Sequence, residues 1–445
     1  MSRAATRINR RQDQRAVRSG EEQDIVAQAN AASLPDPASA GSAAPSAARR
    51  IGALDGLRGV AALMVLLHHV LLTLPDFANA EWRVPGATTH GVVEWLLIRT
   101  PLELAWSGET RALLFFVLSG FVLALPWLNG RNAPYGRFLL NRFCRIYPPY
   151  LIAMAVAAVG SIALGGYPLV HATIFFNQLG WAFPASWHAV PSIGAVLGNQ
   201  SSRYMNEAIW TLVWEVRVAL IFPLLMIPIA RWGNRGVALV LAALVGLNLV
   251  ADRLLGPVLP AALNQPLEIF YFAQFFVFGA AMAANRAAIA AWFVCRHRLL
   301  GVLCLALGCL LCWPHWPIED ERIVALGAMV IVGVAAGSAP VQAALECAPL
   351  LWLGRQSYSL YLIHLPLIMV VVILFRGAVP VAVCCALVPG CILLGWAFHR
   401  WVERPSVALT QQAIGQLAGL GERWKLARAP LSQDAGLAPE APAHN

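Results

Sequence analysis

Long apolar stretches alternate with shorter polar ones along most of the chain. Most of the apolar stretches have about the 20 residues that a helix needs to cross a bilayer. They cover residues 57–75, 112–128, 147–165, 209–229, 236–254, 267–285, 299–314, 323–339, 357–375 and 378–399. The pattern predicts an all-α polytopic integral membrane protein with about ten transmembrane helices.

The two ends of the chain lack this pattern. Residues 1–50 are rich in Arg, Ala, Ser and Gln and contain no apolar core of a signal peptide. Residues 409–445 end in Ala/Pro-rich sequence. We expect both to be mostly disordered cytoplasmic tails, and we expect residues 51–408 to form one transmembrane domain that holds the chemistry.

Composition supports a membrane protein. Of 445 residues, 59% are hydrophobic and 12% are charged, against about 25% charged in soluble domains. The net charge of +9 is therefore assigned to membrane topology and not to nucleic-acid binding. The nine cysteines fall mostly in apolar stretches, so we expect neither a metal site nor a disulfide framework.

Arginines are unevenly distributed among the connections. Residues 129–146, 230–235 and 286–298 are arginine-rich, whereas 165–208 contains only Arg203. The positive-inside rule then places both termini in the cytoplasm, in a multi-pass protein of the cell (inner) membrane. The loop 165–208 also carries Trp181, Trp187 and His188, which suit either sugar contact or, as we favour, anchoring at the membrane interface.

The first apolar stretch contains ionisable residues at membrane depth, in the sequence LDGLRGVAALMVLLHHV. Arg58 and His69 are eleven residues apart, about three helical turns, so they share one helix face about 16 Å apart. That spacing suits a long ligand with an anionic head and a reactive end within the bilayer. Alternatively, Arg58 reaches the headgroups and His69 hydrogen-bonds a neighbouring helix.

A carboxylate occurs in the fourth stretch, in the sequence AIWTLVWEVRVALIFPLL. Glu215 and Arg217 are two residues apart and cannot face each other on a helix, so Glu215 is expected to find its partner elsewhere. With this helix running from outside to inside, we expect Glu215 at a depth similar to that of His69, where it could orient the imidazole.

Three further groups of polar residues are candidates. Ser357, Tyr361 and His364 form a stripe on one helix face, which lines a pocket or joins helices. Arg142 and Arg145 grip phosphate or only mark the cytoplasmic side. Ser119-Gly120 favours close helix packing.

Together these residues resemble acyltransferase family 3, the multi-span O-acyltransferases of cell-surface carbohydrates and lipids. The resemblance is carried by LDGLRG with His69, FFVLSGF at 115–121, RFCRIYPPYL at 142–151, IWTLVWE at 209–215, LGRQSYSLYLIH at 353–364 and VERP at 402–405. It implies that an acyl-CoA, expected to be acetyl-CoA, enters as co-substrate from the cytoplasm and that a hydroxyl accepts the acyl group. It also implies that Arg58 and His69 are tied to activity.

The resemblance extends to the other site residues. Arg142 and Arg145 match the family's RxxR, which we expect to hold acyl-CoA together with Arg58. Glu215 matches the family's glutamate. We expect the substrate pocket to contain Ser119, Trp210, Ser357, Tyr361 and His364.

In this interpretation, His69 acts as general base or carries the acyl group as an acyl-imidazole. The acceptor is a saccharide or glycolipid, with no tightly bound cofactor. We expect a stand-alone form without the extracytoplasmic domain that some members append, so a separate partner protein could handle the acceptor.

A multi-span transporter or flippase for a glycan or a lipid-linked substrate is the alternative, since buried Arg, Glu and His also suit a proton-coupled carrier. No internal repeat relates the two halves of this sequence, which argues against that alternative. A catalytically silent relative is a third interpretation, and the presence of Arg58, His69 and Glu215 argues against it.

Overall fold

The computed structural model describes residues 52–106, 108–130, 134–166, 169–179, 181–182, 205–256, 258, 267–296, 298–313 and 320–427. Helices make up almost all of these residues and none of them lies in a strand, so the all-α prediction is confirmed. The expected disordered tail at 1–50 and residues 428–445 lie outside the described residues.

The helices follow one another in chain order. The first half comprises α2 (Gly52–Leu71), α3 (Pro75–Glu81), α4 (Val92–Arg99), the 3₁₀ turn η1 (Pro101–Ala105), α5 (Gly108–Leu128), α6 (Tyr135–Leu164), α7 (Ile174–Leu179), the 3₁₀ turn η4 (Glu207–Ile209) and α8 (Trp210–Trp232). The second half comprises α9 (Asn234–Val250), the π-turn η5 (Ala251–Leu255), α11 (Ile269–Ala284), α12 (Arg286–Val294), α13 (Arg298–Leu311), α14 (Glu321–Gly337), α15 (Ala339–Leu345), α16 (Ala348–Leu374), α17 (Val381–Phe398), the π-turn η6 (His399–Glu403) and α18 (Arg404–Ala427).

Among the described residues, seven helices are long and apolar enough to cross a membrane, or nine if each of two bent pairs is one span. The bent pairs are α11 with α12, at 57°, and α14 with α15, at 93°. The stretch predicted at 299–314 forms a shorter apolar helix over Leu299–Leu311. The protein is thus a polytopic membrane protein, and the ten predicted stretches all overlap helices.

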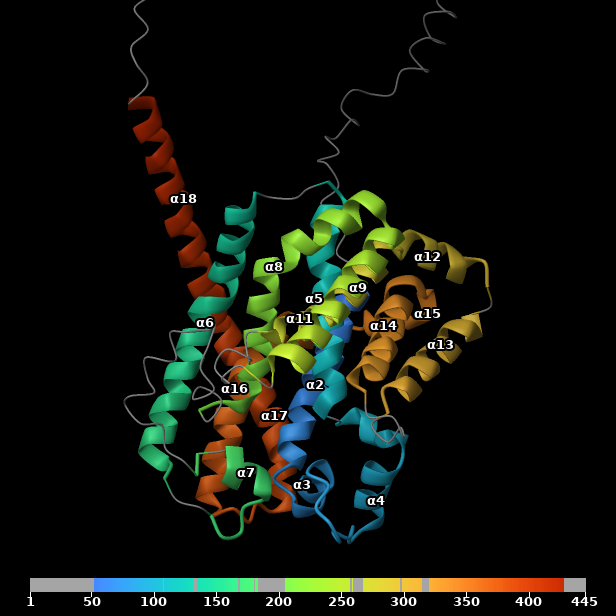
Figure 1. Cartoon of the computed structure of the whole chain (residues 1–445). Helices are drawn as coiled ribbons and strands as arrows, with labels where there is room; N and C mark the ends of the chain where they lie inside the picture. The colour runs from blue at the N-terminus through green and yellow to red at the C-terminus, as the bar shows by residue number, and fades with distance from the viewer. Residues whose placement is uncertain are drawn as a thin grey trace, which may run out of the picture. The chain divides into compact units, whose positions relative to one another are not determined.

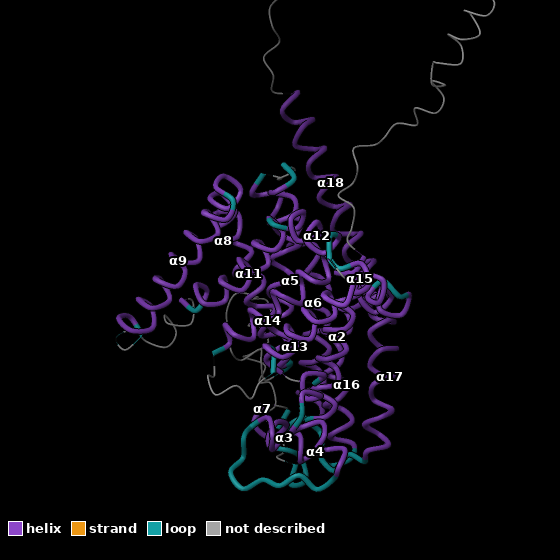
Figure 2. The backbone as a smooth tube through the Cα atoms, turned by 90° about the vertical axis from the view of Figure 1, so that its right-hand side faces the viewer, coloured by secondary structure: helices purple, strands orange, loops and turns teal. Residues whose placement is uncertain are grey.

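Within the helical unit, two ends can be distinguished. Helices α3, α4 and α7 gather at one end, which we call the α3 end, and α18 extends from the opposite end, which we call the α18 end (Figures 1 and 2). Because α2 leads into α3, its residue His69 lies towards the α3 end and Arg58 towards the α18 end.

Helices α2 and α16 pack with their backbones in contact. A Cβ atom on Gly354 would lie 1.9 Å from the carbonyl oxygen of Asp55, and one on Gly59 would lie 2.5 Å from that of Leu350. Glycine is therefore needed at both positions for this approach. The contact sets the polar stripe of α16 against the face of α2 that carries the arginine and the histidine.

Helices α5 and α11 make a second close contact at the centre of the unit. A Cβ on Gly120 would lie 2.0 Å from the carbonyl oxygen of Phe276, and one on Gly279 would lie 1.9 Å from that of Val117. The packing role predicted for Ser119-Gly120 is confirmed for Gly120. The same contact between α5 and α11 fixes the rotation of α5, and so the position of the neighbouring Ser119.

Part of the tail expected at 409–445 is described. Residues 409–427 belong to the helix α18, and residues 428–445 lie outside the described residues. The π-turn η6 joins α17 directly to α18, so the helix is already nucleated where α18 begins and needs only to propagate.

Candidate active site

A cavity of about 340 Å³ lies among α2, α5, α6, α8 and α16, towards the α18 end. Its ionisable lining residues are Arg58, Arg142, Arg145, Arg355, Glu215, Glu403, Tyr358 and Tyr361. The four arginines and two glutamates give the lining a formal net charge of +2. A concave site with excess guanidinium groups is suited to bind an anion such as phosphate.

An ion pair between α6 and α8 organises one wall of this cavity. Arg142 donates from Nη2 to Oε1 of Glu215, and Ser119 donates from Oγ to the same oxygen at 3.2 Å. The Nε atom of Arg142 is buried and has no hydrogen-bond partner among the described residues. The ion pair therefore leaves part of the donor capacity of this guanidinium unused.

The remaining arginines line the same cavity from α2, α6 and α16. Arg58 forms an ion pair with Asp55, one turn earlier on α2, at 3.3 Å. Arg145 lines the cavity beside Arg142 because residues three apart share a helix face. Arg355 of α16 also lines it and was not predicted from the sequence.

The deep end of the cavity is formed by Phe115, Thr211 and Tyr361. The hydroxyl groups of Thr211 and Tyr361 are hydrogen-bonded to each other between α8 and α16. The ring of Tyr361 lies 6.1 Å, centroid to centroid, from the ring of His364. Tyr361 thus stands between the arginine-lined cavity and the histidines behind it.

Those histidines form a buried pair between α2 and α16. Nδ1 of His69 lies 2.9 Å from the carbonyl oxygen of Val65 and 3.2 Å from Nε2 of His364. Nδ1 of His364 lies 2.9 Å from the carbonyl oxygen of Leu360. The two side chains are 5% and 0% exposed, and Phe175 of α7 packs against the His69 ring with centroids 5.8 Å apart.

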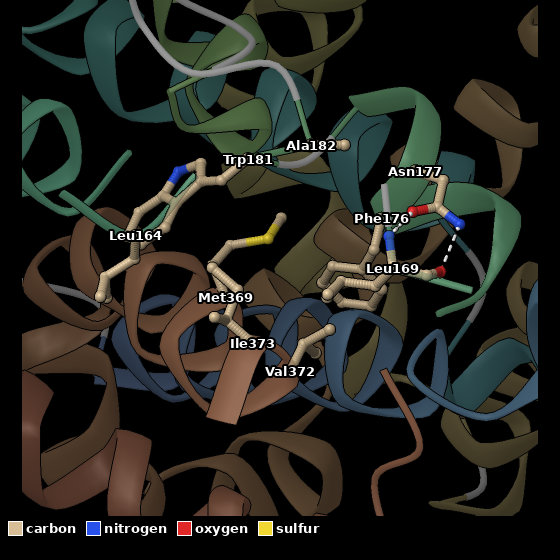
Figure 3. Close-up of a pocket in the computed structure, with 9 residues that line it drawn as sticks. All are labelled: Leu164, Leu169, Phe176, Asn177, Trp181, Ala182, Met369, Val372 and Ile373. Carbon is tan, nitrogen blue, oxygen red and sulfur yellow. Dashed lines mark hydrogen bonds between the residues drawn. The ribbon is translucent and has the colours of Figure 1, made fainter. Parts of the chain in front are cut away.

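Helix α7 is held in place next to this pair. Phe175 and Phe176 lie at right angles, 5.1 Å apart, so that one ring contacts His69 while the other faces a small pocket of about 70 Å³ (Figure 3). In that pocket Trp181 is buried and donates from Nε1 to the carbonyl oxygen of Met205 at 2.9 Å. The anchoring role predicted for Trp181 is therefore wrong, whereas Trp187 and His188 lie outside the described residues.

Glu215 does not lie at the depth of His69. Asn206, just before α8, donates to the carbonyl oxygen of Leu362, close to His364, at 2.9 Å. Nine residues of helix then carry the chain about 13 Å further towards the α18 end, where Glu215 meets Arg142. The expected pairing of Glu215 with His69 is replaced by two separate pairs, Arg142–Glu215 and His69–His364.

The predicted substrate-pocket residues divide into two groups. Ser119, Ser357 and Tyr361 line the cavity. Trp210 does not line it and instead packs on other aromatic rings, because it is five residues from Glu215 and so about 140° away on the helix. His364 lies behind Tyr361 in the histidine pair.

Thr211 and Glu403 are further cavity residues that were not predicted from the sequence. Thr211 lies one turn before Glu215 on the same face of α8, which is a signal that helical spacing could have provided. Glu403 belongs to the quoted VERP segment but received no role. Its carboxylate accepts hydrogen bonds from Ser359 and from Nδ1 of His399, the latter at 2.9 Å.

A further group of ionisable residues lies on the α3 side of the histidines. His68 donates from Nδ1 to the carbonyl oxygen of Trp106 at 2.9 Å, and Arg111 donates to the same oxygen at 3.1 Å. Glu81 lies 3.9 Å from Nε2 of His68. Burial raises the pKa of Glu81, and burial together with the charge of Glu81 raises the pKa of Glu103 to about 8.

Comparison with known proteins gives a family for most of this chain. A family model described as "Acyltransferase domain" matches residues 51–400. The chain is 22% identical to the peptidoglycan O-acetyltransferase OatA of Listeria monocytogenes over 347 residues, 72% of this chain and 49% of that protein. It is 26% identical to the acyltransferase MdmB of Streptomyces mycarofaciens over 415 residues, 86% of this chain and 95% of that protein.

A putative peptidoglycan O-acetyltransferase of Bacillus subtilis, YrhL, is 23% identical over 384 residues, 80% of this chain and 55% of that protein. The chain therefore spans about half the length of the two peptidoglycan O-acetyltransferases that it matches. No solved structure matches the chain.

Proposed function

We propose, since the chain belongs to the acyltransferase family whose model matches residues 51–400, that it transfers an acyl group from acyl-CoA to a hydroxyl of a saccharide or glycolipid. Acetyl-CoA is the proposed donor, and the names of the OatA and YrhL relatives support a cell-envelope saccharide as acceptor. The observation that carries the proposal is the arginine-lined cavity, which ends at Tyr361 directly beside the histidine pair.

In this proposal the cavity binds the anionic part of the donor. Arg58, Arg142 and Arg145 hold phosphate groups of CoA, and Glu215 fixes the guanidinium of Arg142 in place. At about 340 Å³ the cavity is at the small end of ligand pockets. It therefore takes only a part of the donor, and the acyl end extends past Tyr361 towards His69.

The proposed chemistry takes place at His69. Its imidazole removes the proton of the acceptor hydroxyl, the hydroxyl oxygen forms a bond to the acyl carbon, and the carbon–sulfur bond of the thioester breaks. The CoA sulfur leaves with the bonding electron pair and takes the proton from the imidazolium. An acyl-imidazole intermediate on His69 is the alternative route to the same products.

The proposal also fixes an orientation. CoA is a cytoplasmic metabolite, so the α18 end with its arginines faces the cytoplasm and the α3 end faces outward. The arginine-rich connections 129–146, 230–235 and 286–298 then lie on the cytoplasmic side, as the positive-inside rule requires. We propose the cell (inner) membrane as the location, with both termini inside.

The test uses the purified full chain in lipid nanodiscs with acetyl-CoA and soluble peptidoglycan fragments. Ester formation is measured by mass spectrometry and thiol release by a colorimetric reagent. We expect the wild type to form the ester and H69A to lose about 10²- to 10⁴-fold in rate. H171A, at an exposed histidine outside the site, serves as the matched control.

Two results would contradict the proposal. Near wild-type turnover of H69A would remove His69 from the reaction. In liposomes of the same lipid composition, movement of a glycan across the bilayer without ester formation would favour a transporter or flippase.

A further inference from the structure

His364 was expected to line the substrate pocket, but its place in the structure points to a different role. It is completely buried, it lies behind Tyr361, and its ring nitrogen Nε2 is 3.2 Å from Nδ1 of His69. Two imidazoles in contact at a reacting centre raise the question of which nitrogen carries which proton.

The backbone carbonyls around the pair answer that question. A carbonyl oxygen can only accept a hydrogen bond, so the nitrogen 2.9 Å from it must carry a proton. Nδ1 of His69 therefore donates to the carbonyl of Val65, one turn earlier on α2, and Nδ1 of His364 donates to that of Leu360, one turn earlier on α16. With both rings neutral, Nε2 of each ring is left with a lone pair.

The contact between the rings then has one consistent assignment. The proton on Nδ1 of His69 is shared between the carbonyl oxygen of Val65 and Nε2 of His364, which accepts. Nε2 of His69 makes no hydrogen bond to the described residues and keeps its lone pair. A general base needs such a free lone pair.

We infer that His364 is a positioning residue, which holds His69 in the tautomer with a free Nε2 and stabilises the imidazolium that forms there. This inference rests on the proposed acyl transfer. When Nε2 of His69 takes the acceptor's proton, the ring becomes cationic and its Nδ1–H becomes a stronger donor. His364 and Val65 are the two acceptors already placed to receive that hydrogen bond.

Other charged and titratable groups around the pair do not replace this contact. His68 lies next to His69 on α2, with ring centroids 5.0 Å apart, but its Nδ1 is bonded to the carbonyl of Trp106. Arg111 of α5 acts electrostatically on both rings. Tyr361 of α16 is hydrogen-bonded to Thr211, and Cys391 of α17 donates from Sγ to the backbone carbonyl of His364 and not to its ring.

The test compares two substitutions of one residue. H364L removes the acceptor and keeps an apolar side chain, whereas H364Q keeps an acceptor oxygen at about the position of Nε2. With acetyl-CoA and peptidoglycan fragments, we expect H364L to lower kcat about 10- to 100-fold, with the KM for acetyl-CoA unchanged. H364Q should recover most of that loss. M369L, a volume-conserving substitution on the same helix, is the control (Figure 3).

A direct readout of the protonation state separates this inference from the proposed function. In the protein labelled with ¹⁵N-histidine, nitrogen chemical shifts report which ring nitrogen of His69 carries the proton, and H69Q identifies its signals. We expect Nδ1–H in the wild type and in H364Q. We expect H364L to populate the Nε2–H form as well.

The possible results have distinct meanings. A wild-type protein that forms no ester would overturn the proposed function, while the chemical shifts still test His364. Full kcat in H364L, or an Nε2–H tautomer of His69 in the wild type, would overturn the inference alone. If H364L fails to insert into the membrane, the kcat of H364Q and the tautomer of His69 in the wild-type spectrum still test the inference.

Discussion

Replacing Arg142 with glutamine tests whether the cavity holds the phosphate-bearing end of an acyl-CoA. The substitution lowers the formal charge of the lining from +2 to +1 and leaves Glu215 without its cation. A hydrogen bond to a charged group contributes about 1.5–3 kcal/mol. Because about 1.4 kcal/mol corresponds to a factor of ten, we expect the KM for acetyl-CoA to rise about 10- to 150-fold.

The kcat of R142Q should change much less than its KM. Arg142 lies on the cavity wall, and Tyr361 separates the cavity from the histidines. R142K keeps the charge but loses the planar fork, so its KM should be intermediate. Raising the ionic strength should raise the KM of the wild type more than that of R142Q, since salt screens the charge that the variant lacks.

A double-mutant cycle that combines R142Q with E215Q measures the coupling free energy of the Arg142–Glu215 ion pair. The Arg142 and Glu215 side chains are 18% and 29% exposed, so their coupling should fall between that of exposed and buried pairs, at about 1–3 kcal/mol. R231Q, at an exposed arginine of α8 outside the cavity, controls for charge in general. An unchanged KM in R142Q, or an equal rise in R231Q, would refute the assignment of the cavity.

Two further substitutions test packing and burial. G120L should lower the thermal midpoint by several degrees, because its side chain meets the backbone of Phe276 and overpacking costs about 1–3 kcal/mol. The control G246L, whose Cβ meets nothing within 4 Å, should leave the thermal midpoint unchanged. Equal effects of the two substitutions would contradict the α5–α11 contact. Burial raises the pKa of Glu103 to about 8 in the folded protein, so the native state retains a proton that the unfolded chain loses, and stability should fall as the pH rises from about 4.5 to 8. Thermal midpoints measured across that pH range should show this fall in the wild type and not in E103Q. If the midpoint of E103Q depended on pH as strongly as that of the wild type, Glu103 would not be a buried neutral acid.

The hydrophobic pattern predicted the helices well because every apolar stretch in a membrane must satisfy its backbone internally. It did not predict the bends of 57° and 93° within two of those stretches. These bends fall at Asn285 and Ser338, between α11 and α12 and between α14 and α15. Such breaks depend on which neighbouring helix each half packs against, which local sequence does not encode. The helix α18 was not predicted for a related reason. Its sequence is polar and has no apolar face that signals a helix, and it forms as a continuation of α17.

Most of the ionisable residues that line the cavity could be predicted from the sequence. Arg58, Arg142, Arg145 and Glu215 were all identified, and the structure brings them to one cavity. Their pairing could not be predicted, because the depth of Glu215 depends on where α8 begins. Counting from the edge of an apolar stretch assumes that the helix starts at the membrane surface. In this protein the chain that leads into α8 is already level with Leu362 of α16 at Asn206, before the helix begins.

The eleven-residue interval between Arg58 and His69 is therefore constrained by more than a shared helix face. Both residues lie on α2, yet their surroundings differ: Arg58 lines the cavity with residues of α5, α6, α8 and α16, whereas His69 contacts His364 of α16. The glycine contacts at Gly59 and Gly354 fix the rotation of α2 against α16. One residue more or less between Arg58 and His69 would turn one of them by about 100° relative to the other. Arg58 would then leave the cavity or His69 would leave its partner, so the eleven-residue interval is a requirement of the helix packing as much as of any ligand that spans the two sites.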